Sequence, residues 1–131
     1  MRVILPSVLL SLIVAGGVAN GEQGGAEEPP PLYRCDRIAV PEAGKPATFS
    51  GFYEAEFESS SFKVSRVPCE VWLTGDVCPI FGKGKCTKGA QVKAYITVEG
   101  VLSDVGHFGH FGMWERELRV TRVLKVQRIK E

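Results

Sequence analysis

The residues 100–118, GVLSDVGHFGHFGMWEREL, decide how the chain is expected to fold. Glycine occupies every third position at the centre of this stretch: Gly106, Gly109 and Gly112. Glycine adopts positive φ at low cost, so we expect a loop that folds tightly over one end of a sheet and presents the His-Phe pairs between the glycines. The two longest β-patterned runs, 90–103 and 114–129, flank this loop and predict neighbouring antiparallel strands.

Period-two alternation predicts three further strands, at 47–58, 61–67 and 69–74. The first of these runs turns five residues toward the core: Phe49, Gly51, Tyr53, Ala55 and Phe57. We expect residues 59–60 to turn the chain. Residues 75–89 contain too much glycine for a helix and therefore predict a long loop.

The last run, 114–129, contains two conflicting patterns. One phase holds the apolar residues Trp114, Leu118, Val120, Leu124 and Val126. The same phase holds three arginines, Arg116, Arg122 and Arg128. We expect a β-bulge near Arg122 to shift the register and send Val123 inward. A helix is the competing interpretation, but the valine and threonine content favours a strand.

Together these runs predict an all-β protein: a small, five-stranded, closed or partly open barrel that is OB-fold-like and stapled by disulfides. OB-type barrels bind ligands with the loops after strands one and four. The chain has 131 residues and four cysteines, Cys35, Cys69, Cys78 and Cys86. Four cysteines allow three pairings; we favour Cys78 with Cys86, closing a short loop, and Cys35 with Cys69.

The N-terminus predicts export. Residues 1–19 have a basic start, an apolar core and small residues before a polar stretch, which is typical of a signal peptide cleaved after Ala19; an uncleaved anchor is the alternative. Residues 20–31 are rich in Gly, Glu and Pro and predict a flexible tether, leaving 32–131 as a single β-barrel domain. We expect a periplasmic or secreted protein whose mature form has no membrane span.

Charge argues against a general nucleic-acid or anionic-membrane binder, because 16 basic and 15 acidic residues leave the chain near neutral. Three lysines do cluster among glycines: Lys83, Lys85 and Lys88. They lack the spacing of a phosphate-binding P-loop, so we interpret them as solvated charges with a secondary role in steering an acidic partner. Three glutamates of the first strand are expected to pair with the arginines of 114–129: Glu54, Glu56 and Glu58. Without such pairs, the three arginines would form an anion-binding row.

The pattern G-x-L-S-x-x-G-x-x-G-H-x-G-x-W-x-R-E-L, from Gly100 to Leu118, together with residues 57–60, resembles one found in small exported bacterial proteins for which no activity is known. The resemblance covers about the C-terminal half of the chain and one strand. It implies an envelope or secreted origin, in a Gram-negative-type bacterium, and a barrel fold. It transfers no catalytic residue.

The candidate binding residues gather in and beside the glycine loop: His107, Phe108, His110, Phe111, Trp114 and Arg116. Aromatic residues anchor interfaces, so we predict a non-enzymatic binding module that engages an envelope or extracellular protein or glycan through residues 104–114. We predict no catalytic residue, cofactor or nucleic-acid partner.

Two alternatives stay open at the level of the sequence. His107 and His110 could bind zinc or copper, with Glu115 or Glu117 as a third ligand, in a metal carrier or metal-dependent enzyme. The chain also resembles, in its cysteines and barrel pattern, the OB-type protease inhibitors. Those inhibitors use a cysteine at the mature N-terminus, whereas Cys35 lies well inside this chain.

Overall fold

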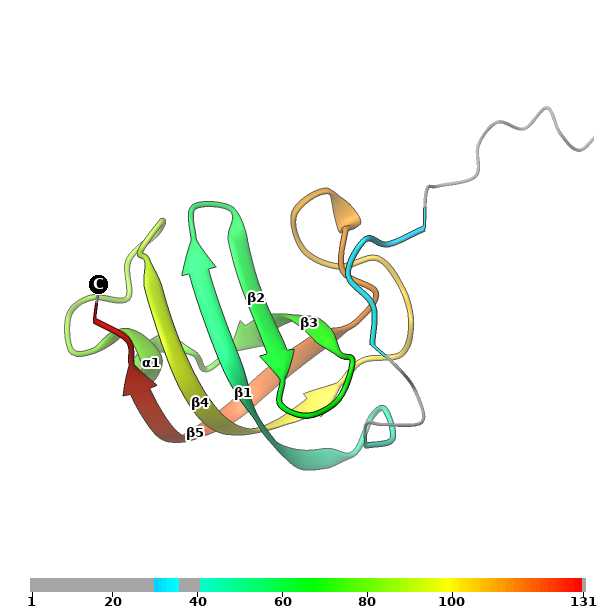
Figure 1. Ribbon diagram of the computed structural model, residues 1–131, viewed down its shortest axis with the longest axis horizontal. Helices are drawn as coiled ribbons and strands as arrows, with labels where there is room; N and C mark the ends of the chain where they lie inside the picture. Colours follow the sequence, from blue (N-terminus) through cyan, green and yellow to red (C-terminus); the bar gives the residue numbers. More distant parts are fainter. Residues whose placement is uncertain (1–29, 36–40, 131) are drawn as a thin grey trace, which may run out of the picture.

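Five strands form a ring-like sheet in the computed structural model, which describes residues 30–35 and 41–130 (Figure 1). The strands are β1 (Pro46–Glu56), β2 (Ser59–Val64), β3 (Glu70–Gly75), β4 (Val92–Leu102) and β5 (Glu117–Arg128). Their order is β1-β2-β3-β5-β4, and β4 pairs back onto β1. The β3–β5 pair is parallel and every other pair is antiparallel. The prediction of an all-β, five-stranded protein is therefore confirmed, while the OB-like assignment stays a prediction.

The predicted signal peptide, 1–19, lies outside the described residues, as does the predicted tether except for Pro30 and Pro31. No helix in the described part of the chain has the length and apolar content to cross a membrane.

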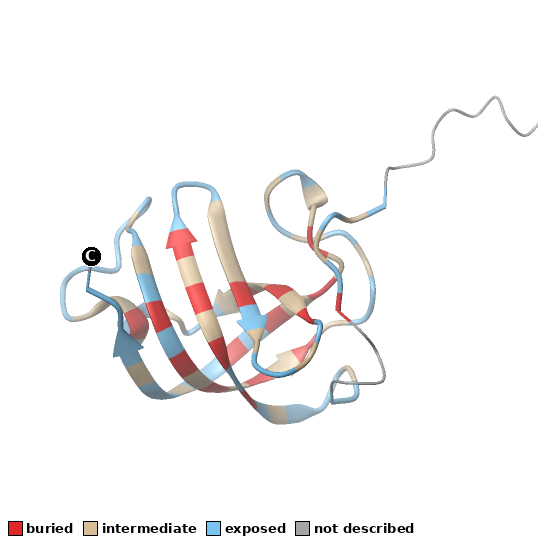
Figure 2. Cartoon of the chain, viewed as in Figure 1, coloured by how far each residue is buried: buried red, intermediate tan, exposed pale blue. Residues whose placement is uncertain are grey.

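The core lies inside the ring, where alternate residues of each strand meet. Figure 2 shows this alternation as buried bands along β1 and β4. The inward residues of β1 are the predicted ones except for the last: Phe49, Gly51, Tyr53 and Ala55 are buried. Phe57 was expected to be inward, but its side chain is 65% exposed. The chain turns at Phe57 and Glu58 rather than at residues 59–60, so the alternation ends before Phe57.

Two register shifts break the pairing of β5 with β4, one between Thr97 and Val98 and one between Glu99 and Gly100. A shift of this kind places an extra residue in one strand and sends the following residues to the opposite face. Val123 consequently packs against the core, which confirms the predicted bulge. Leu124 is the extra residue of the first shift and is 41% exposed. The helical interpretation of this segment is wrong.

A four-residue helix, α1 (Cys78–Phe81), lies in the segment that was predicted to be loop alone. Pro79 stands in its first turn, where a proline is tolerated because that N–H has no partner within the helix. Ile80 is fully buried and anchors the turn to the core. The prediction missed α1 because one turn is too short to produce a helical period.

Both favoured disulfides are present, Cys35–Cys69 and Cys78–Cys86. The first attaches the N-terminal segment to the start of β3. The second closes the loop that follows α1. Each native disulfide of this kind stabilises a fold by about 2–4 kcal/mol.

A short polar chain crosses the core. The Tyr53 hydroxyl donates to the Ser60 Oγ at 2.8 Å, and the Ser60 hydroxyl donates to the carbonyl oxygen of Leu73 at 2.8 Å. These two hydrogen bonds join β1, β2 and β3. Burial of Tyr53 raises the pKa of its hydroxyl, and the hydrogen bond with Ser60 opposes that rise.

Candidate functional site

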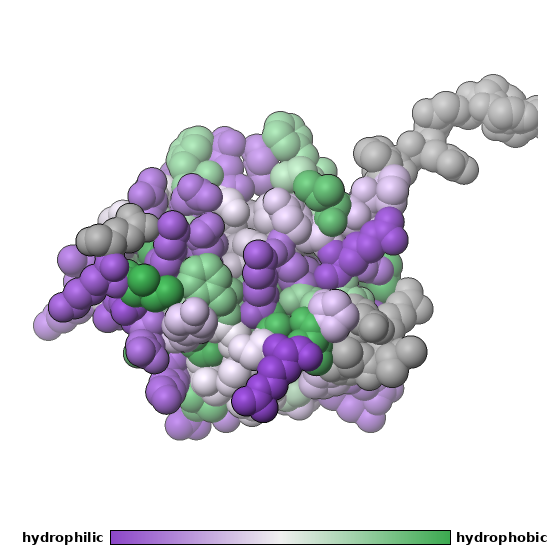
Figure 3. Space-filling model, viewed as in Figure 1, coloured by the Kyte–Doolittle hydropathy of each residue, from purple (hydrophilic) through white to green (hydrophobic). Residues whose placement is uncertain are grey.

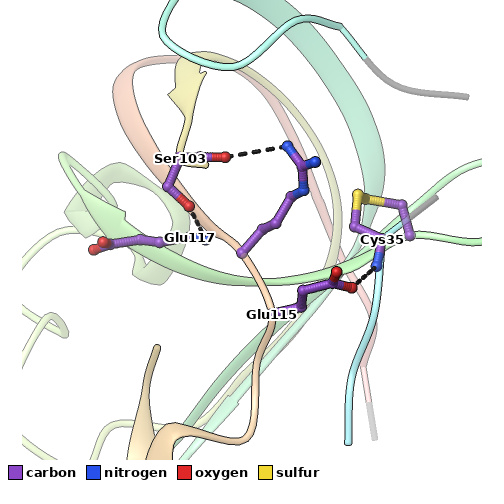
Figure 4. Close-up of a disulfide and its surroundings, with 6 residues drawn as sticks. Cys35, Ser103, Glu115 and Glu117 are labelled. Carbon is purple, nitrogen blue, oxygen red and sulfur yellow. Dashed lines mark hydrogen bonds between the residues drawn. A yellow bond between two sulfur atoms is a disulfide. The ribbon is translucent and has the colours of Figure 1, made fainter. Parts of the chain in front are cut away.

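The β4–β5 connection, residues 103–116, is a closed ladder rather than an open loop. At its base, Ser103 N–H donates to the Glu117 carbonyl at 2.8 Å. Glu117 N–H donates to the Ser103 Oγ, also at 2.8 Å (Figure 4). Further up, Gly106 N–H donates to the Glu115 carbonyl at 2.8 Å. Phe108 and Trp114 then exchange backbone hydrogen bonds of 2.8 and 3.1 Å. These bonds leave only residues 109–113 as the tip.

Arg116 belongs to the base of this ladder. Its side chain is only 5% exposed, and its Nη1 donates to the Ser103 carbonyl at 3.2 Å. Its own carbonyl accepts from Trp72 N–H on β3 at 3.0 Å. The expected ion pairs between the β5 arginines and the β1 glutamates do not form among the described residues, because β4 lies between β1 and β5. Glu54 instead approaches Lys93 of β4 at 4.0 Å.

Trp114 anchors the loop to the sheet. Its side chain is 2% exposed. Its ring stacks on Tyr33 with centroids 4.6 Å apart and meets Trp72 edge-on at 4.7 Å. Tyr33 lies in the N-terminal segment. Its N–H donates to the Met113 carbonyl, and its carbonyl accepts from the Glu115 N–H. Trp114 is thus part of the structural support of the predicted site and not of its surface.

Gly109 lies directly on this aromatic cluster. A Cβ at this position would overlap the rings of Trp72 and Trp114, and its φ of +73° is one that glycine adopts most easily. The glycine pattern in the sequence therefore has a specific cause here, which is the close approach of the backbone to two indole rings.

The tip of the loop presents Phe111 to solvent. Its side chain is 85% exposed, and its backbone lies in the left-handed region at φ 57° and ψ 18°. Such a conformation costs a non-glycine residue about 1–2 kcal/mol, and strain of this kind concentrates at functional positions. The neighbouring His110 ring lies 3.9 Å from the Phe111 ring, centroid to centroid.

A second turn meets the tip from β1 and β2. His110 Nε2 lies 3.2 Å from Glu58 Oε2, and Glu58 is also left-handed, at φ 64°. Beside it stands the exposed Phe57. We call these four residues the rim: Phe57, Glu58, His110 and Phe111. Figure 3 shows hydrophobic side chains at the top of the view, over the β1–β2 turn and over the β4–β5 loop.

The sequence prediction named two residues of the rim and missed the other two. His110 and Phe111 were predicted, whereas Phe57 and Glu58 were assigned to a strand. The available signal was the end of the alternation next to the predicted turn. Of the remaining predicted site residues, His107 is exposed and Phe108 is half-buried, and both lie on the ladder below the tip.

Among the residues that the structure describes, no third ligand converges on the alternative metal site of His107 and His110. His107 Nδ1 lies 3.3 Å from the Gly112 carbonyl oxygen, while His110 faces Glu58. Glu115 accepts from Cys35 N–H at 3.2 Å, and Glu117 accepts from the Thr74 hydroxyl at 2.6 Å. Within the described residues, no group of three or more His, Cys, Asp or Glu side chains is placed to hold a metal ion.

Comparison of the chain with protein-family models, with curated proteins and with solved structures finds no match.

Proposed function

We propose that the protein is an exported, non-enzymatic binding module that engages an envelope or extracellular protein or glycan through the rim. The observation that carries this proposal is the exposure of Phe111 on a strained backbone at the tip of a loop that is otherwise firmly held. A flexible loop can bury a phenylalanine by moving it. Here the ladder and the Trp114 cluster fix the backbone of the loop, so the Phe111 ring stays exposed to solvent. This exposure favours a role in contact with a partner.

The composition of the rim favours a protein over a glycan as the partner. Two phenylalanines provide large, rigid apolar contacts, and exposed aromatic residues of this kind act as anchors in protein interfaces. The pair of Glu58 and His110 between them supplies a polar centre that a partner can meet with hydrogen bonds. Because both turns are held by strands, binding at this rim loses little conformational entropy.

Export is part of the proposal. It is supported by the predicted signal peptide at 1–19 and by the two disulfides, which form and persist in oxidising compartments. The direct test is the N-terminal sequence of the protein recovered from the cell exterior or periplasm. A mature chain that begins at Asn20 is the expected result.

Partner capture tests the rim. Immobilised wild-type protein is compared with Phe111→Ala and with Leu124→Ala, which removes an exposed apolar residue outside the rim, for recovery of envelope proteins and for binding to an array of bacterial glycans. We expect the wild type and Leu124→Ala to retain the same partner and Phe111→Ala to lose at least tenfold in recovery. Equal recovery by all three would show that the rim is not the contact surface.

A further inference from the structure

Positive charge is concentrated in two segments of a chain that is close to neutral overall. The segments 76–91 and 117–130 contain eight lysines and arginines but only two carboxylates, Asp76 and Glu117. All eight cations are exposed. We call the outward face of β5 that carries Arg119, Arg122 and Lys125 the basic surface; the other five cations are Lys83, Lys85, Lys88, Arg128 and Lys130. In Figure 3 hydrophilic side chains crowd the end of the molecule near the C-terminus.

The charges of the basic surface are not neutralised within the described residues, where none of the eight cations forms an ion pair. The remaining described lysines behave differently. Lys45, Lys63 and Lys93 each have a glutamate oxygen within 4.0 Å. A solvated charge needs no partner, but a group of unpaired like charges creates a positive potential that attracts anions.

The bulges in β5 align three of these cations. Arg119, Arg122 and Lys125 are three residues apart, and a regular strand would place them on alternating faces. Their register partners are successive outward positions of β4, namely Val101, Glu99 and Thr97. Each register shift adds one residue to β5, so all three cations face outward, about 7 Å apart. The one carboxylate opposite them, Glu99, forms no ion pair within the described part of the chain.

The outward row ends at Lys125, because Arg128 pairs with the buried, inward-facing Ala94 of β4. The Arg128 guanidinium donates to the carbonyl oxygens of Ile80 and Pro79, at 2.8 and 3.2 Å, and so fixes α1 to the end of β5. The Cys78–Cys86 bridge then holds Lys83 and Lys85 near that end. A surface groove of about 750 Å³ lies here, lined by Asp76, Lys83, Arg128 and the disulfide.

We propose that the basic surface binds a linear polyanion, and that this polyanion is an acidic polysaccharide. Charges arranged in a row match a linear polymer better than the plane of a membrane. Tyr95 lies on the same outward face of β4, two residues from Thr97, and is 54% exposed. Its ring packs on Phe52, with centroids 5.4 Å apart, and its exposed part can pack against a sugar ring. Two disulfides indicate an oxidising compartment, where polysaccharides with carboxylates or sulfates are the common extended anions.

The test measures the affinity of the full chain for two labelled dodecasaccharides, one of alginate (carboxylates) and one of heparin (sulfates), by fluorescence anisotropy. The variant Arg122→Gln/Lys125→Gln removes two charges from the row. Its matched control, Lys45→Gln/Lys63→Gln, removes two charges that are already paired. Thermal melting of each variant verifies that it is folded.

We expect at least one dodecasaccharide to bind the wild type. The row variant should bind it about tenfold more weakly, and the control should stay within about twofold. Raising the salt concentration from about 50 to 200 mM should weaken binding by roughly 2.5-fold for each cation engaged, so the row variant should show a smaller salt dependence. The dodecasaccharide that binds shows whether the surface recognises carboxylates or sulfates.

Three results would overturn the proposal. Binding of neither dodecasaccharide would remove the ligand class. Tighter binding of a single-stranded DNA dodecamer, or of vesicles that contain phosphatidylglycerol, would assign the surface to another polyanion. Equal losses in the row variant and in the control would mean that net charge, and not the aligned row, determines affinity.

Discussion

Two glycine-rich loops leave the sheet, and they are held in place by different means. Residues 103–116 are held by backbone hydrogen bonds and by packing on Trp114. Residues 76–91 are held by the Cys78–Cys86 disulfide and by the hydrogen bonds of Arg128. The first loop presents a strained phenylalanine and the second presents lysines. Packing on Trp114 thus supports a shaped apolar tip, whereas the disulfide, together with Ile80 buried in the core, keeps the lysines of the second loop near one another in solvent.

The difference predicts that the two loops respond to separate changes. Loss of aromatic packing should release the rim and leave the disulfide loop in place. Loss of the disulfide should do the reverse. The following predictions run from the largest expected effect on stability to the smallest.

Replacement Trp114→Ala should destabilise the fold by about 3–5 kcal/mol, as expected when a buried large aromatic side chain is removed. Both Tyr33 and Trp72 lose a ring partner in this variant. Urea unfolding measures the loss, and Leu124→Ala, an exposed site on β5, serves as the control with a change below about 0.5 kcal/mol. A loss under about 1 kcal/mol for Trp114→Ala would contradict the packing account.

Gly109 and Gly84 share a φ of +73°, but Gly109 combines it with a ψ of −165°, a backbone region that is essentially confined to glycine. Alanine at Gly84 meets no atom within 4 Å and should cost about 1 kcal/mol for its left-handed backbone. Alanine at Gly109 meets the Trp72 ring as well, which should add about 1–3 kcal/mol for overpacking. Equal losses of unfolding free energy in the two variants would mean that the backbone of the loop does not rest on the tryptophans.

Removal of the second disulfide, by Cys78→Ser/Cys86→Ser, should cost about 2.5 kcal/mol, since the bridge closes a short loop across a sequence separation of 8. The expected local result is faster amide hydrogen exchange in residues 82–91 with no change in residues 106–114. Increased exchange in both segments would show that the two loops are not independently supported.

The core hydroxyl of Tyr53 should make stability fall at high pH. Its pKa is raised by burial, so above about pH 10 the folded state retains a proton that the unfolded state releases. This group's contribution is complete below the unfolded pKa and is lost as pH rises through the folded pKa, with a slope of up to about 1.4 kcal/mol per pH unit. Tyr53→Phe should remove that slope in urea titrations at about pH 9 to 11, the range around the usual tyrosine pKa. An unchanged slope would contradict the assignment.

Much of the fold could be predicted because burial in a sheet has period two. The inward residues of β4 and the first half of β5 follow from alternation alone, and the two disulfides follow from loop closure and the need to hold the N-terminal segment. The burial pattern in the second half of β5 could not be predicted from alternation alone, because two register shifts change the period. The sequence indicated one of them through the conflict between leucine, valine and arginine.

The candidate site was less predictable, because it is assembled from two turns. Phe111 was recognisable from the glycine pattern around it. Trp114 and Arg116 were placed in the same site, yet the ladder of residues 103–116 buries both of them below the tip. The contact between His110 and Glu58 joins residues 52 positions apart, and no local pattern reveals such a contact. Alternation also fails at a turn, which is why Phe57 was expected inside.

The central claim is that the rim contacts a partner, and site-specific photocrosslinking tests it most directly. A photoreactive phenylalanine analogue is placed at position 111 and, as the control, at Ser65, an exposed residue at the opposite end of β2. Ultraviolet irradiation in intact cells should give a discrete adduct from position 111 and none from position 65. Adducts of equal yield from both positions, or none from position 111, would contradict the account.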